Sequence, residues 1–125
     1  MKKNTLSILL ILFITSSCYK NQKNCSHFKT GTFQFNFEIN GQKKTSLFER
    51  TSTTEIDYFE GKTDTSSIRW INDCEYILEK RHPKNMREEK AIHVKILSTT
   101  EKTYTFEFSN VGNSQKQKGT ITKIN

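Results

Sequence analysis

Three cysteines carry the clearest chemistry in this chain, and the first of them, Cys18, stands at the end of an export signal. Lys2 and Lys3 give a positive start, residues 6–14 are apolar, and the small residues 15–17 come directly before the thiol. This order is typical of a segment that is cut from an exported protein. The apolar stretch is too short for a transmembrane helix, which needs about 20 residues. We therefore predict a signal peptide over residues 1–17.

A cysteine placed directly after the small residues resembles the lipobox of bacterial lipoproteins. The resemblance implies that Cys18 is acylated, becomes the first residue of the mature chain and holds it at the outer membrane. Tyr19 follows where an aspartate would indicate retention in the inner membrane, and no acidic run marks export to the cell surface. We therefore expect the periplasmic face. An ordinary secretion signal that happens to end near Cys18 is the alternative.

Cys25 and Cys74 then remain as an even pair in an oxidising compartment, and we predict a disulfide between them. A loop of about 50 residues closed in this way stabilises the fold by roughly 4 kcal/mol in the chain-entropy description. Two free thiols or a metal site are the alternatives. The three histidines, His27, His82 and His93, have no ligand spacing of the His-x-x-x-His kind, so we expect no metal and no cofactor.

No nucleophile, base and acid stand at a recognisable spacing in the sequence. The serines lie in turn-like segments without Gly-x-Ser-x-Gly, and the five glycines form no phosphate-binding loop. We interpret Asp57, Glu60 and Asp64 as a solvated face near a turn, rather than as an acid–base pair or a calcium site. The sequence therefore predicts a protein that is not an enzyme.

Size and charge predict one basic domain. Removal of residues 1–17 leaves 108 residues with a net charge of +5, against +7 for the whole chain. The basic residues are scattered, which indicates solubility near a surface; attraction to anionic headgroups or an acidic partner is the alternative. Residues 18–29 are polar and predict a lipidated tether before a single β domain over 30–125. Export argues against nucleic acid as a partner.

Apolar and polar residues alternate with period two through this domain, which indicates β-strands. About eight strands follow one another at short intervals with turn residues between them. We predict an all-β fold, an antiparallel meander that forms a small barrel or half-barrel. Its predicted apolar face consists of Phe33, Phe35, Phe37, Ile68, Trp70, Tyr76, Leu78, Ile92, Val94, Ile96, Tyr104, Phe106 and Phe108.

The Asn-Gly pair at residues 40–41 predicts a tight hairpin. A two-residue turn places Phe48 opposite Phe33, but it also places Lys44 opposite Phe37. The second strand therefore has a poor apolar face. Either its register differs, or it lies at an edge, or it lines a partly polar interior.

A second hairpin is predicted within residues 66–80, with a three-residue loop at 71–73. The expected opposite pairs are Trp70 and Cys74, Ile68 and Tyr76, and Arg69 and Glu75. The last pair joins opposite charges on the outer face. A single strand through Asn72 is the alternative, and it gives seven strands instead of eight.

Nearly the whole mature chain resembles a group of small, uncharacterised bacterial lipoproteins, through segments 28–33, 70–76 and 122–125 and through Arg50. These motifs identify relatives rather than an activity. Some members carry the label "DNA topoisomerase IV", but an exported domain of this size does not hold the DNA-binding and ATPase parts of a topoisomerase. The Gly31-x-Phe33 strand opening is also similar to that of lipocalin-type barrels. That resemblance implies a lipocalin-like fold and an apolar ligand.

We predict a lipid-anchored, non-enzymatic binding or accessory module of the cell envelope, with an envelope protein as its partner. One alternative is a lipocalin-like carrier of a small apolar ligand, with Trp70, Tyr76, Tyr104 and Phe106 as pocket walls. Another is an inhibitor of a secreted enzyme such as lysozyme. A filled aromatic core favours the accessory module, and an open cavity favours the carrier.

Overall fold

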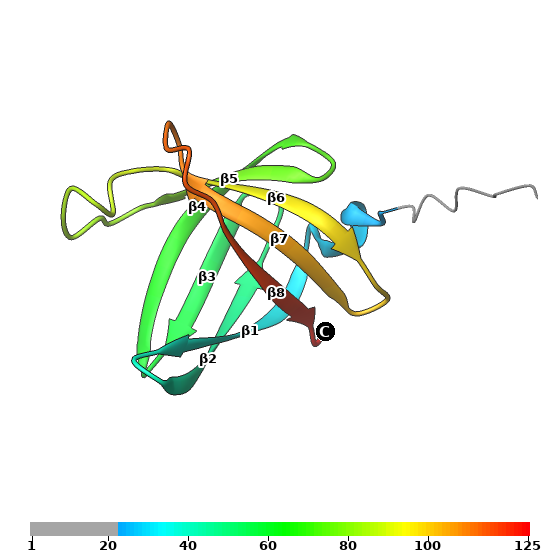
Figure 1. Ribbon diagram of the computed structural model, residues 1–125, viewed down its shortest axis with the longest axis horizontal. Helices are drawn as coiled ribbons and strands as arrows, with labels where there is room; N and C mark the ends of the chain where they lie inside the picture. The colour runs from blue at the N-terminus through cyan, green and yellow to red at the C-terminus, as the bar shows by residue number, and fades with distance from the viewer. Residues whose placement is uncertain (1–22) are drawn as a thin grey trace, which may run out of the picture.

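Eight antiparallel strands form a closed barrel in which each strand pairs with the next and the last pairs with the first (Figure 1). The computed structural model describes residues 23–125; the predicted signal peptide, Cys18 and the first part of the predicted tether lie outside them. The elements are a 3-10 helix, η1 (Cys25–Phe28), and the strands β1 (Gly31–Ile39), β2 (Gln42–Arg50), β3 (Thr54–Phe59), β4 (Lys62–Asn72), β5 (Glu75–Lys80), β6 (Ile92–Thr99), β7 (Thr103–Asn110) and β8 (Gln117–Lys123). The predicted all-β meander is confirmed, and the barrel is closed, as in lipocalins.

The first hairpin has the register of a two-residue turn, and the structure thereby decides between the alternatives that the sequence left open. Asn40 and Gly41 both have positive φ, 51° and 77°, as a two-residue turn of the type favoured by Asn-Gly requires. Phe33 lies opposite Phe48, and Phe37 lies opposite Lys44. Because β2 pairs with both β1 and β3, it has no free edge, and its polar residues of this parity line the interior of the barrel.

The turn between β3 and β4 is shorter than the sequence indicated. Only Glu60 and Gly61 form it, again with positive φ at both positions. Asp64 is therefore a strand residue, paired with Asp57 on the interior face of the barrel. The interpretation of these two carboxylates as a solvated turn face is wrong, because β4 begins at Lys62 and places Asp64 within the strand.

The hairpin of β4 and β5 exists, but its predicted pairing is wrong by two residues. Trp70 lies opposite Tyr76, Ile68 opposite Leu78 and Arg69 opposite Ile77. A β-bulge between Trp70 and Asn72 accommodates one extra residue in β4. The backbone amide of Cys74 donates a hydrogen bond to the side-chain oxygen of Asn72 at 2.9 Å. A shift of two residues keeps every side chain on its predicted face, because successive residues alternate between the faces.

The predicted apolar face points into the barrel. Seven of its members are at most 5% exposed, namely Phe33, Ile68, Tyr76, Val94, Ile96, Tyr104 and Phe106. Five others pack against this core while partly buried, namely Phe35, Trp70, Leu78, Ile92 and Phe108. The structure adds five core residues outside the predicted face, namely Cys25, Phe28, Phe48, Ile77 and Ile121.

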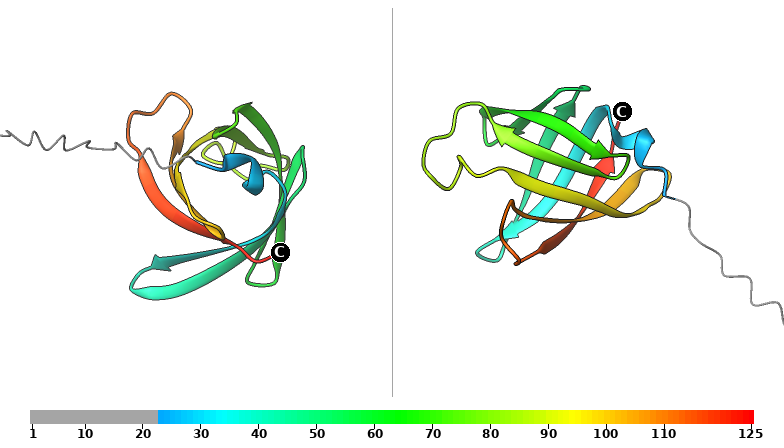
Figure 2. Two further views of the ribbon diagram at one scale, coloured as in Figure 1. Left: turned by 90° about the vertical axis from the view of Figure 1, so that its right-hand side faces the viewer. Right: turned by 90° about the horizontal axis from the view of Figure 1, so that it is seen from above.

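The short helix η1 closes one opening of the barrel. Figure 2 (left) shows it lying across the ring of strands. Cys25 forms the predicted disulfide with Cys74, and Phe28 is fully buried against Tyr104, with ring centroids 5.1 Å apart. Residues 25–28, placed in the tether by their sequence, therefore belong to the packed domain, since a buried aromatic ring and a disulfide fix them there.

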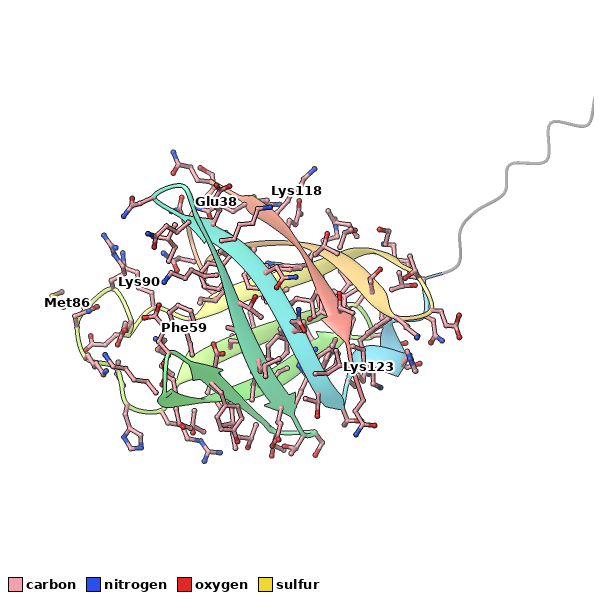
Figure 3. All side chains as sticks on the ribbon, turned by 90° about the horizontal axis from the view of Figure 1, so that it is seen from below. Glu38, Phe59, Met86, Lys90, Lys118 and Lys123 are labelled. Atoms are coloured by element: carbon pink, nitrogen blue, oxygen red, sulfur yellow. A yellow bond between two sulfur atoms is a disulfide. The ribbon has the colours of Figure 1, made fainter. Side chains whose placement is uncertain are left out.

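The two ends of the barrel differ. η1, the β4–β5 turn and the C-terminus gather at one end, whereas the other end carries the long loop of residues 81–91. Figure 3 shows Phe59, Met86 and Lys90 at this second end and Lys123 near η1. The Lys123 ammonium donates to the carbonyl of His27 in η1 at 2.7 Å. Within residues 23–125, no helix is long and apolar enough to cross the membrane.

Candidate functional site

The interior of the barrel has two parts of different character. We call the part beneath η1 the closed half; its side chains are those of Phe28, Phe33, Phe48, Arg50, Tyr76 and Tyr104. We call the part toward the loop of residues 81–91 the open half; Phe35, Ser46, Asp57, Leu78, Ile92, Phe106, Phe108 and Ile121 line it. The first is filled and the second holds a cavity.

Arg50 is the centre of the closed half and is only 3% exposed. Its Nη1 donates to the carbonyl of Phe28 at 2.8 Å, and its Nη2 donates to the hydroxyls of Tyr76 and Tyr104 at 3.0 and 3.1 Å. Its Nε donates to Glu55 Oε2 at 2.9 Å, with Nη2 2.8 Å from the same oxygen. The guanidinium therefore has a partner on each of its nitrogens.

Aromatic rings surround this guanidinium. Its central carbon lies 4.7 Å from the Tyr76 ring centroid, 4.8 Å from Phe33 and 5.3 Å from Phe48, distances at which rings attract a cation. Burial raises the pKa of Glu55, and the facing Arg50 limits that rise. Burial likewise raises the pKa of both tyrosines, so their hydroxyls stay neutral and can accept from Arg50. This arrangement locks η1 to the barrel.

The open half contains a cavity of about 230 Å³. Phe35, Phe106, Phe108 and Ile121 form one wall, from β1, β7 and β8. The cavity adjoins an outer pocket of about 340 Å³ at the mouth of the barrel, since Glu55, Asp57, Leu78 and Ile92 line both. A recess of this kind, mostly apolar with a few polar groups, is the usual form of a small-molecule site.

Asp57 is the polar group at the junction of cavity and mouth. Its Oδ1 is buried and has no hydrogen-bond partner. Burial raises the pKa of Asp57. A hydrogen bond from Ser46 and the nearby charge of Lys80 oppose this rise, and the charge of Asp64 adds to it. A buried carboxylate oxygen without a partner costs folding free energy, about 1–3 kcal/mol or more.

The cation nearest this carboxylate is already engaged. Lys80 Nζ lies 2.8 Å from Asp64 Oδ2 and 3.2 Å from Glu88 Oε1. Hydrogen bonds to these two carboxylates raise the pKa of Lys80 against the opposing effect of its burial. Lys80 thus pairs with the carboxylates of Asp64 and Glu88, and no cation lies in ion-pair contact with Asp57 among the described residues.

Two of the four predicted pocket-wall residues line the cavity. They are Phe106 in the open half and Tyr76, which lies at the boundary of the closed half. Trp70 and Tyr104 do not, because they pack around Arg50, 5.9 Å from its central carbon in each case. The indole Nε1 of Trp70 is also buried without a hydrogen-bond partner.

Some features of the site escaped the sequence interpretation. Arg50 was recognised only as part of a shared motif, and Asp57 was placed on a solvated surface. Both have the parity of inward-facing residues, with Arg50 two positions after Phe48 and Asp57 opposite Phe48 across β2 and β3. Parity was the available signal, and polarity outweighed it.

The groups that line the cavity indicate which interactions a bound molecule could make. Across the described chain, no group of three His, Cys, Asp or Glu side chains is arranged to hold a metal ion. The pair of His93 Nε2 and Glu75 Oε2, 2.9 Å apart, joins outward-facing positions on β6 and β5. The cavity itself is lined by apolar rings, by the hydroxyl-bearing Ser46 and Tyr76, by Arg50 and by the carboxylates of Glu55 and Asp57, which suit recognition.

The chain matches no family model, no curated protein and no solved structure. The geometry of the barrel is therefore the basis on which a function is assigned.

Proposed function

We propose that this protein is a lipid-anchored, non-enzymatic binding module of the cell envelope whose open half holds a small, largely apolar ligand. The cavity beneath the mouth carries this proposal. It combines a wall of phenylalanine rings with a buried carboxylate oxygen that has no partner in the protein. A core filled from end to end would favour a purely structural accessory module; here only the closed half is filled.

The position of the anchor supports an outward-facing mouth. The amide of Asn24 donates to the side chain of Thr99 at 2.9 Å, and Thr99 ends β6 beside η1. Five residues separate Asn24 from Cys18, a distance of at most about 20 Å in an extended chain. A lipid on Cys18 therefore lies near the closed half, and the mouth, about 30 Å further along β1, faces away from the membrane.

A cavity-filling substitution tests the binding function. Ile121 lines the cavity and is 5% exposed, so Ile121→Phe adds a ring in the open half. We expect a neutral fluorescent apolar probe, N-phenyl-1-naphthylamine, to bind the wild type and to bind this variant at least about tenfold more weakly. Leu47→Phe is the matched control, because Leu47 is 41% exposed on the outer face. Equal binding by wild type and Ile121→Phe, with both folded by circular dichroism, contradicts the proposal.

Co-purification gives a second test of the same site. Small molecules retained by the wild-type protein from its own envelope are extracted and identified by mass spectrometry. A compound present with the wild type and with Leu47→Phe, but absent from Ile121→Phe, is the expected result. Turnover of peptidoglycan, esters or phosphoesters by the pure protein would contradict the non-enzymatic part.

The anchor is tested separately. We expect mass spectrometry of the native protein to find a mature chain that begins at acylated Cys18. Cys18→Ala should release the protein into the soluble fraction, because one residue carries the lipid. An intact segment 1–17, or an unmodified Cys18 on a membrane-bound chain, contradicts the lipoprotein assignment.

A further inference from the structure

The polar wall of the cavity indicates which chemical group the ligand presents. Asp57 projects from β3 toward the interior, where its Oδ1 is buried and unpartnered. A protein seldom keeps such an oxygen without a function, because the missing hydrogen bond reduces stability. The group that completes this site must donate a hydrogen bond, and it gains most if it also carries a positive charge.

The cations of the protein near the cavity cannot fill this role. Arg50 donates to Glu55, Phe28, Tyr76 and Tyr104. The second inward cation, Lys80, bridges Asp64 and Glu88, as its 2.8 and 3.2 Å contacts show.

The loop of residues 81–91 supplies further cations, all of them exposed to solvent. Arg87 and Lys90 line the outer pocket, and Lys84 lines a neighbouring pocket that Asp57 also lines. Lys90 is seen at the outer end of the barrel in Figure 3. Solvent and salt screen charges in such positions. Asp57 therefore remains the one inner carboxylate, among the described residues that line the cavity, without a cation in contact.

The wall of the cavity that lies opposite Asp57 favours a ligand with a hydrocarbon part. Phe35, Phe106 and Phe108 come from β1 and β7, across the interior from β3. The rings of Phe35 and Phe106 meet edge to face at 5.8 Å, and those of Phe106 and Phe108 lie 5.7 Å apart. A ligand in this space thus meets aromatic surface on one side and a carboxylate on the other.

We propose that the cavity binds a small amphipathic amine, with its ammonium group on Asp57 and its hydrocarbon part against Phe35, Phe106 and Phe108. This inference rests on the proposed function and adds the class of ligand. An ammonium group supplies both the missing donor and the missing charge. A carboxylate ligand in the same position places a second negative charge beside the buried Asp57, which disfavours its binding.

A matched series of ligands tests this assignment. Octylamine, 1-octanol and octanoate are titrated by calorimetry at pH 7 into the chain from residue 18 onward with Cys18→Ser, which leaves every described residue unchanged. We expect octylamine to bind at least about tenfold more tightly than octanol, as a charged hydrogen bond provides, and octanoate to bind most weakly.

Two charge variants identify the responsible residue. Asp57→Asn should abolish the preference for octylamine and leave octanol binding within about twofold of the wild type. Glu49→Gln is the control, because it removes the same charge from an exposed position on β2 that faces outward. It should retain the preference. Carbon-13 shifts of the Asp57 carboxyl give an independent readout: octylamine should make this group titrate at a lower pH.

The outcomes separate the two proposals. Equal binding of amine and alcohol, tighter binding of octanoate, or a preference that survives Asp57→Asn overturns the amine assignment and leaves the binding module in place. Failure of all three ligands and of the naphthylamine probe to bind overturns the proposed function and the amine assignment together.

Discussion

The two halves of the barrel interior place charge in the same kind of environment and treat it in opposite ways. In the closed half, Arg50 is buried beneath η1 and each of its nitrogens has a partner. In the open half, Asp57 is buried against apolar rings and one of its oxygens has none. The first arrangement maximises stability, and the second gives up stability where a ligand has room to enter. We infer that folding and binding are assigned to different ends of one barrel.

The largest expected effect comes from removing the charge at the centre of the closed half. Arg50→Met leaves Glu55 buried without its partner and removes the donors from the Phe28 carbonyl and two tyrosines. We expect the free energy of unfolding to fall by about 3–5 kcal/mol, measured by urea denaturation. The double variant Arg50→Met with Glu55→Gln should recover part of this loss, since it no longer buries an unpaired charge. A loss below 1 kcal/mol would show that the closed half does not depend on Arg50.

The disulfide is expected to have the next largest effect. The double variant Cys25→Ser with Cys74→Ser removes a bond between residues that are 49 positions apart in the sequence. For a loop of this length, the chain-entropy description gives a fall in the free energy of unfolding of roughly 4 kcal/mol. Because Cys25 holds η1, amides of residues 25–29 should also exchange hydrogen faster than those of β6 and β7. Uniform acceleration across all strands would instead indicate that η1 and the barrel open as one unit.

A smaller loss of stability is expected when a substitution in β8 narrows the cavity of the open half. A Cβ at Gly119 would lie 2.8 Å from Cζ of Phe106 and 3.1 Å from Cε2 of Phe35. Gly119→Ala therefore forces these rings toward the cavity, at a cost of about 1–3 kcal/mol. Binding of the naphthylamine probe should weaken by a larger factor than for Leu47→Phe. Unchanged affinity would mean that the rings move elsewhere and that the cavity does not depend on them.

The smallest expected effect is a gain in stability rather than a loss. The raised pKa of Asp57 means that this group supports folding fully below its unfolded pKa, about 3.9, while it is protonated, and that this support is lost as pH rises through the folded pKa. Asp57→Asn should therefore unfold at a higher temperature than the wild type at pH 7, with a gain on the order of 1 kcal/mol. The gain should shrink toward zero below about pH 4. A variant less stable than the wild type at pH 7 would show that Asp57 is a structural group.

The site was predicted from the sequence only in part, and the residues that were not predicted fall into two groups. The alternation that selected Phe33 and Tyr76 depends on apolar residues, so it passed over Arg50 and Asp57, which share the same inward parity. Phe28 was missed because it precedes the first strand, where no period exists to place it. Polar residues in a barrel interior become recognisable only when their partners, drawn from distant strands, are known.

The sequence by itself determined the features that depend on neighbouring residues. The period-two pattern predicted the strands and most of their buried faces, Asn40-Gly41 predicted a hairpin, and the two cysteines beyond the predicted lipidation site predicted their disulfide. Only the tertiary structure decided that β8 closes on β1, through pairs such as Phe35 and Ile121, and that η1 seals one end. The physical reason is range: a hairpin turn or a strand face is set by residues a few positions apart, whereas closure, the environment of Arg50 and the missing partner of Asp57 depend on strands that are distant in the chain.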